Sequence, residues 1–112
     1  MSCGEKKLPF LYDFDHVSNI VVRAVNTYGD RAQMDMMIEE MSELTKALCK
    51  FRRAETNITR DAVLEEMADV QIMLYQMALI FGDPNPWIDA KLHRLEDRLN
   101  NRESQSCCTT SE

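Results

Sequence analysis

The stretches IEEMSELTKAL, residues 38–48, and LEEMADVQIML, residues 64–74, decide the fold of this chain. In both, apolar residues recur every three or four positions, which is the period of one face of an α-helix and not of a strand. In both, two adjacent acids are followed by a third acid three residues after the second. The two stretches therefore predict two long amphipathic helices that carry matching acidic clusters.

Outward from these stretches, the apolar period and the helix-breaking residues predict four helices and no strand. The first covers about residues 15–28 and is ended by Gly29 and Asp30, and the second covers about 31–54. The third runs from about Thr59 to Phe81. After the breaker GDPNP, the fourth begins near Pro86 or Trp87 and ends near Asn100. The predicted fold class is all-α, resembling a four-helix bundle.

Apolar stripes on these helices predict the core. The stripe on the second helix consists of Met34, Met37, Ile38, Met41, Leu44, Leu48 and Phe51. The third helix has a stripe of Val63, Met67, Val70, Leu74, Met77 and Phe81, and it is apolar almost all round. A helix apolar around its circumference belongs in the middle of a bundle or between subunits. We therefore expect a homo-oligomer and not a stable monomer.

The length of 112 residues fits one domain. We expect residues 1–13 to be an N-terminal extension and residues 14–100 to be the helical domain. Residues 101–112 have no periodic apolar residue, which predicts a disordered tail.

Composition and charge exclude several classes of function. The net charge is −6 and the sequence pI is about 4.9, which argues against a partner such as DNA or RNA, because their phosphate backbones require a basic surface. No apolar run is long enough to span a membrane, and the N-terminus is unlike a signal peptide. The four cysteines follow no zinc-binding or disulfide pattern, which favours reduced thiols in a cytoplasmic protein.

The acidic clusters predict a metal site. Glu40 and Glu43 lie at the margin of the stripe on the second helix, and Glu66 and Asp69 lie at the margin of the stripe on the third. Four carboxylates facing one another repel unless protons or cations compensate them. Oxygen ligands without Cys or His suit Mg²⁺, with Mn²⁺ as a substitute. The alternative reading is that these are ordinary acids on solvated helix surfaces, while a di-iron site is disfavoured because no histidine follows a glutamate by three.

The two acidic motifs together resemble a known family. Glu39-Glu40-x-x-Glu43 followed by Glu66-x-x-Asp69, with 22 residues between the two parts, is similar to the EExxE…ExxD pattern of the MazG-like, all-α NTP pyrophosphatase superfamily. The resemblance covers about residues 14–100. It implies a helical bundle that forms a dimer or a tetramer and hydrolyses a nucleoside triphosphate to the monophosphate and pyrophosphate. It also implies that Glu40, Glu43, Glu66 and Asp69 bind Mg²⁺.

The chemistry of pyrophosphate release needs further groups. Water must attack the α-phosphorus, and Glu39 or Glu43 can accept its proton, but the sequence does not choose between these two acids. Cations should hold the outer phosphates, and the candidates are Lys50, Lys91 and Arg94. His16 is the histidine to examine for contact with the base.

Two other functions stay open at this stage. Phosphoribosyl-ATP pyrophosphohydrolase, an enzyme of histidine biosynthesis, has the same reaction type. A non-catalytic helical interaction module would use its acidic pairs only for solvation.

Overall fold

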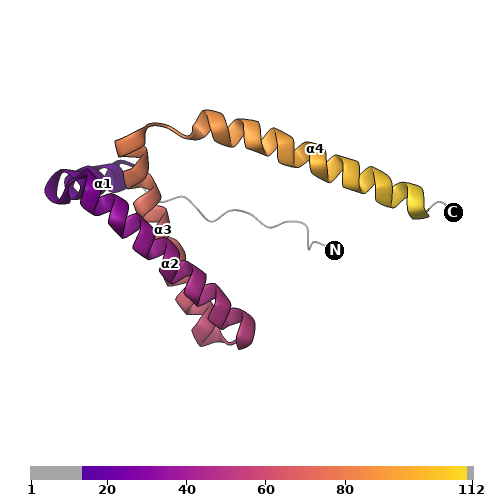
Figure 1. Cartoon of the computed structure of the whole chain (residues 1–112), viewed down its shortest axis with the longest axis horizontal. Coiled ribbons are helices and arrows are strands. Elements are labelled where there is room, and N and C mark those ends of the chain that lie inside the picture. The colour runs from indigo at the N-terminus through magenta and orange to yellow at the C-terminus, as the bar shows by residue number, and fades with distance from the viewer. Residues whose placement is uncertain (1–13, 111–112) are drawn as a thin grey trace. The chain divides into compact units, whose positions relative to one another are not determined.

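The computed structural model describes residues 14–110 and confirms the all-α prediction for them. It contains α1 (Phe14–Tyr28), α2 (Asp30–Arg53), α3 (Asn57–Phe81) and α4 (Asn85–Thr110), and no strand among the residues it describes (Figure 1). The predicted extension over residues 1–13 lies outside the described residues.

The chain divides into two compact units, one ending at Ile80 and the other beginning at Phe81. This division differs from the single domain predicted for residues 14–100. The boundary lies where α3 ends, next to Gly82, whose φ of 118° belongs to the left-handed region that favours glycine. Pro84 follows and restricts the residue before it to extended conformations, so the helix cannot continue.

In the first unit, a single glycine separates α1 from α2. The N–H of Gly29 donates to the carbonyl of Val25 over 2.8 Å, and the carbonyl of Gly29 accepts from the N–H of Gln33 over 3.2 Å. Its φ is 91°, which side chains rarely adopt. The predicted break at Gly29 is thus confirmed. Val21 of α1 is buried, so α1 packs into the unit through its apolar side.

The turn between α2 and α3 is held by two threonines. The N–H of Thr56 donates to Oγ1 of Thr59 over 3.0 Å, and the N–H of Thr59 donates to Oγ1 of Thr56 over 3.1 Å. This reciprocal pattern satisfies two N–H groups that the first turn of a helix leaves free. Thr56 therefore caps α3. The predicted start near Thr59 is corrected to Asn57, because the cap lies three residues earlier than expected.

Helices α2 and α3 form an antiparallel hairpin. Gln33 hydrogen-bonds to Gln76, Glu40 interacts with Asp69, and the guanidinium of Arg60 lies 5.4 Å from the centre of the Phe51 ring. As the residue number rises along α2, the number of its partner on α3 falls, as an antiparallel pairing requires.

The seam between α2 and α3 matches the predicted stripe of α2 only in part, since Met34, Met37, Leu44 and Phe51 are buried or half-buried as predicted. Ile38, Met41 and Leu48 were expected in the core, but their side chains are 64%, 51% and 45% exposed. The buried or half-buried positions of α2 are instead Gln33, Met34, Met37, Glu40, Glu43, Leu44, Ala47 and Phe51. The centre of the buried face is thus displaced by about 60° around the helix. Amphipathicity located the most apolar face of α2, whereas α3 packs on a face that includes Gln33 and Glu40.

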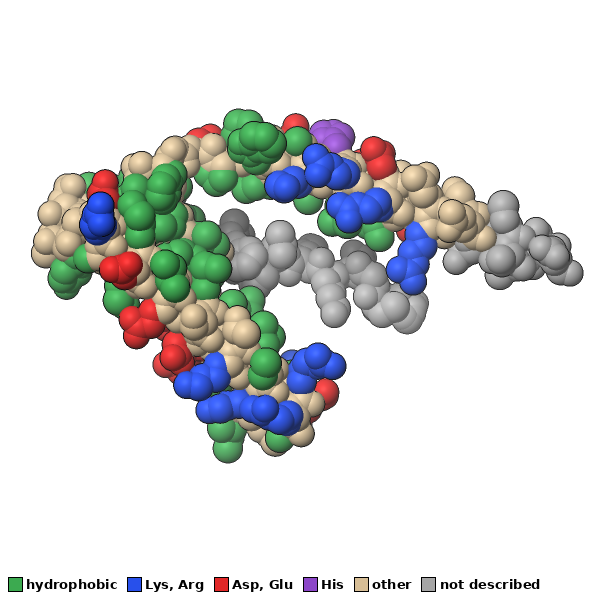
Figure 2. Space-filling model, in the orientation of Figure 1, with side chains coloured by type: hydrophobic (Ala, Val, Ile, Leu, Met, Phe, Trp, Pro, Cys, Tyr) green, Lys and Arg blue, Asp and Glu red, His purple; other side chains and the backbone are tan. Residues whose placement is uncertain are grey.

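The displaced stripe forms an exposed apolar face on the hairpin. Ile38, Met41 and Leu48 each follow a seam residue of α2, and exposed Leu64, Met67 and Leu74 occupy the same kind of position on α3. Antiparallel right-handed helices turn in opposite senses when viewed from one end, so residues one step after both seams lie on the same side of the hairpin. Figure 2 shows hydrophobic side chains on the upper part of the visible side of the hairpin, with acidic and basic side chains along its edge and lower end. We call these six residues the apolar face.

The second unit contains α4. Asp83 accepts the N–H of Asn85 through Oδ1 over 2.9 Å, and the carbonyl of Pro84 accepts from Trp87 and Ile88, which starts the helix. The predicted start near Pro86 is thus late by only one residue. The predicted end near Asn100 is corrected, because α4 continues to Thr110. Residues 101–110 of the predicted disordered tail are therefore helical, and its last two residues lie outside the described residues. No proline or glycine interrupts residues 101–110, so a sequence without an apolar period can still remain helical.

All described side chains of α4, residues 85–105, are exposed, including its apolar row at Ile88, Leu92, Leu95 and Leu99. None of the described helices has the length and apolar character that crossing a membrane requires.

Candidate metal centre

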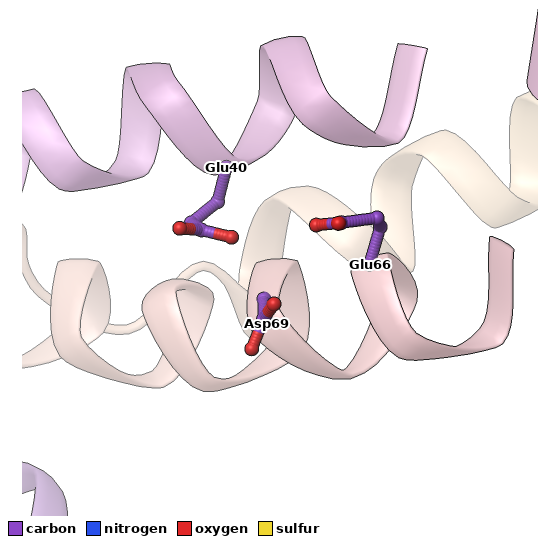
Figure 3. A group of neighbouring side chains, drawn as sticks. All are labelled: Glu40, Glu66 and Asp69. Atoms are coloured by element: carbon purple, nitrogen blue, oxygen red, sulfur yellow. The ribbon is translucent and has the colours of Figure 1, made fainter. Parts of the chain in front are cut away.

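Three carboxylates from two helices converge in the middle of the hairpin. Glu40 extends from α2 toward α3, and Glu66 and Asp69, three residues apart, extend from one side of α3 toward it (Figure 3). One oxygen of each carboxylate lies within 4.8 Å of the others. Glu40 and Glu66 are half-buried because they occupy seam positions. The hairpin therefore places three carboxylate groups next to one another.

Burial and mutual repulsion raise the pKa of two of these groups. For Glu40, burial is the largest cause, followed by the charges of Asp69 and Glu66 and a hydrogen bond with Asp69, and its pKa lies above the ordinary 4.5. For Glu66, burial again comes first, followed by the charges of Asp69, Glu43 and Glu65, and its pKa also lies above 4.5. Both shifts mean that the protein disfavours the charged form of these groups.

One oxygen of the cluster has no partner. Among the residues that the structure describes, Oε2 of Glu66 is a buried side-chain atom without a hydrogen bond. A buried carboxylate oxygen without a partner is unfavourable and rare in folded proteins. A cation bound among the three carboxylates would give this oxygen a partner.

The donor set fits a hard divalent cation. Mg²⁺ binds oxygen at 2.0–2.1 Å, so opposite ligands in its octahedron are about 4.2 Å apart. Adjacent ligands in the same octahedron are about 3 Å apart, and three ligands include at least two adjacent pairs. The three oxygens, which lie within 4.8 Å of one another, would therefore have to move closer together to bind Mg²⁺ or Mn²⁺.

The other two acids of the motif lie around this group. Glu43 is half-buried and close enough to Glu66 to raise its pKa, but it is not one of the three converging carboxylates. Glu39 is exposed, and it contributes the smallest of the effects that raise the pKa of Glu40. The structure thus brings together three of the four predicted ligands and places the two candidate bases beside them.

The candidates for phosphate binding are more widely distributed. Lys50 is exposed near the end of α2, about 10 Å along the helix from Glu43, in a basic region with Arg52 and Arg53. Lys91 and Arg94 are exposed on α4, in the second unit. His16 is exposed in the first turns of α1. The roles predicted for these four residues remain predictions.

Sequence analysis did not identify the buried amides at Gln33 and Gln76, which lie in the same seam as the carboxylates. Gln33 lies seven positions before Glu40, and Gln76 lies seven positions after Asp69. Seven positions are about two helical turns, so each amide lies on the same side of its helix as a carboxylate of the cluster. That spacing was the signal that could have revealed them.

Compared with known proteins, the chain matches no family model, no curated protein and no solved structure. The similarity of its two acidic motifs to the MazG-like superfamily therefore remains a hypothesis based on those motifs.

Proposed function

We propose that this chain is a Mg²⁺-dependent nucleoside triphosphate pyrophosphohydrolase, which converts an NTP or dNTP and water to the monophosphate and pyrophosphate. The observation that carries the proposal is the convergence of Glu40, Glu66 and Asp69, with an unpartnered buried oxygen on Glu66. The similarity of the EExxE…ExxD motif to the MazG-like superfamily gives the reaction class.

The carboxylates would serve as the protein's ligands to Mg²⁺, or to Mn²⁺ in its place. When bound, the cation neutralises phosphate oxygens and lowers the pKa of water in its coordination sphere. An acidic protein needs such a positive charge to bind a triphosphate, since the chain itself has a net charge of −6. Glu40, Glu66 and Asp69 hold their positions through the α2–α3 seam, so they orient the substrate relative to the hairpin.

A proton acceptor is also available beside the three carboxylates. Attack of water on the α-phosphorus releases a proton, and Glu43 or Glu39 would accept it as a general base. Of the two, Glu43 is half-buried whereas Glu39 is exposed, so Glu43 lies nearer the buried part of the site. Lys50, Lys91 and Arg94 are the proposed contacts to the outer phosphates, and His16 is the proposed contact to the base.

Self-association is part of the proposal. The apolar face is exposed on the hairpin, and the chain buries only four apolar side chains among its described residues. Contiguous exposed apolar patches mark surfaces that another molecule covers. A homodimer, or a tetramer of paired dimers, would bury this face.

The test is a panel of pyrophosphate-release assays with the eight common NTPs and dNTPs, each measured with Mg²⁺ and with EDTA. The proposal predicts release of pyrophosphate, but not of orthophosphate, from at least one nucleotide, and only with the metal. A triphosphate cut between the outer phosphates would give orthophosphate and contradict the assigned bond. Absence of release from every nucleotide, together with no thermal shift on adding Mg²⁺, would favour a non-catalytic interaction module.

A further inference from the structure

We propose that the buried pair Gln33 and Gln76 is a positioning device, which holds α2 and α3 in the alignment that brings Glu40 to Glu66 and Asp69. This inference rests on the proposed metal site for its functional meaning. Its structural content, the apposition of Glu40 and Asp69, can be tested without a metal.

The two amides form a direct connection across the seam. Nε2 of Gln33 donates to Oε1 of Gln76 over 2.6 Å, and the residues are 6% and 4% exposed. Nε2 of Gln76 also donates to Sδ of Met73 over 3.5 Å. Buried amides need partners, so one of these glutamines placed opposite an apolar residue would be unfavourable. The pair therefore favours the one alignment of the helices in which the two amides meet.

The rest of the seam specifies alignment weakly. Its buried apolar side chains on the two helices are Met37, Ala47 and Met73. Methionine is flexible and adapts to many neighbours, and alanine is small, so neither defines one register. A single buried polar residue in a helix–helix seam is the better-attested way to fix register.

The location of the pair complements the turn. At one end of the hairpin, the Thr56–Thr59 cap and the contact of Arg60 with Phe51 fix the helices to each other. Gln33 and Gln76 lie toward the opposite end. The carboxylate cluster lies between the two, one heptad from the amides on each helix. Without the amide pair, α2 and α3 could slide or rotate at the open end, and the cluster would be held from one side only.

The experiment compares Gln33→Leu, Gln76→Leu and the double Leu variant, with Gln71→Leu, a glutamine of α3 outside the pair, as the matched control. The single variants remove the hydrogen bond across the seam but leave one buried amide in place, and they should melt at a lower temperature than wild type. The double variant removes both amides and should recover thermal stability. A purely structural role of the pair predicts that all other properties recover with it.

Two readouts separate positioning from stability. The first is the affinity for Mn²⁺ alone, measured by electron paramagnetic resonance well below the melting temperature. Loss of groups that orient metal ligands typically weakens metal binding about 10–100-fold, and we expect the double variant to show a loss in this range. Gln71→Leu should bind Mn²⁺ as wild type does.

The second readout is the rate of disulfide formation between Glu40→Cys and Asp69→Cys, in a background where the four native cysteines are serine. We expect this rate to fall when both glutamines are leucine and to stay unchanged in Gln71→Leu. Unchanged cross-linking in the double variant would overturn the positioning role. If wild type binds no Mn²⁺ but cross-linking still depends on the glutamines, the proposed metal site fails while the positioning role stands.

Discussion

Asp69→Asn should make the metal-free protein more stable and the magnesium-bound protein less stable than wild type. The substitution keeps the size of the side chain and removes one charge next to Glu40 and Glu66. Two unit charges about 4 Å apart repel by about 1 kcal/mol in water-like surroundings, and this value applies here because the site opens to solvent. For a unit of about this size, 1 kcal/mol corresponds to about 4–8 °C in melting temperature. We therefore expect a rise of a few degrees in EDTA.

With Mg²⁺ the order reverses. A cation that binds only the folded state stabilises wild type by about 2.7 kcal/mol at a concentration 100 times its Kd. A tenfold loss of affinity removes about 1.4 kcal/mol of this gain, which exceeds the relief of repulsion. The two melting curves should therefore cross as Mg²⁺ is added.

The assay is a set of melting curves in EDTA and at increasing Mg²⁺, with nucleotide turnover measured in parallel. Asp35→Asn is the matched control, since Asp35 is exposed on α2 and does not affect the pKa of Glu40 or Glu66. It should change stability by less than about 0.5 kcal/mol under both conditions. If Asp69→Asn lowers the melting temperature in EDTA, the charge of Asp69 stabilises the metal-free hairpin, and the repulsion argument is wrong.

Three further predictions follow from the same geometry. The pKa values of Glu40 and Glu66 are raised in the folded state. The stability that these two groups contribute is therefore present below pH 4.5 and is lost as the pH rises through their folded-state pKa values. Melting curves of the metal-free protein should accordingly show a loss of stability from pH 4.5 toward neutrality. Glu43→Gln should abolish pyrophosphate release. It should still bind Mn²⁺ more tightly than Asp69→Asn does, because Glu43 is outside the three converging carboxylates. Equal loss of Mn²⁺ affinity in both variants would make Glu43 a full ligand. Light scattering at micromolar concentration should give at least a dimer. Ile38 is 64% exposed in the single chain, and Ile38→Lys should shift the measured mass toward that of the monomer. A monomeric wild type would contradict the role of the apolar face.

The sequence predicted the existence of the helices better than the way in which they pack. Gly29 and the GDPNP segment are strong breakers, because positive φ angles and proline interrupt a helix regardless of tertiary contacts. The period in residues 38–48 also identified α2 correctly. The period reports how apolar each face is, however, and not which neighbour covers it. Ile38, Met41 and Leu48 were therefore assigned to the core of the chain, whereas they lie on its exposed apolar face.

The same limit applied to the candidate site. Spacing within each motif placed Glu66 and Asp69 on one side of α3, because residues three apart share a helix face. Whether Glu40 or Glu43 of α2 meets them depends on the rotation of α2 about its own axis. The predicted stripe put both at the margin of the core, while the observed rotation turns Glu40 into the seam and leaves Glu43 beside it. Long-range rotation of this kind is set by the contacts between helices, such as the one between Gln33 and Gln76.

The polar layers of the seam are the strongest reason to connect its structure with a function. An α-helical hairpin that served stability alone would have leucine or isoleucine at the positions of Gln33, Glu40, Glu66 and Gln76, since apolar side chains pack there without the cost of removing charges from water. This hairpin instead has polar groups in two adjacent layers, and it leaves Oε2 of Glu66 without a partner among the described residues. Six other apolar residues of the hairpin lie on the exposed apolar face. Local departures from the rules of stable packing concentrate at functional sites, where a ligand supplies the missing interaction. A divalent cation between Glu40, Glu66 and Asp69 would supply it here, and a partner over the apolar face would recover the hydrophobic burial that the seam lacks.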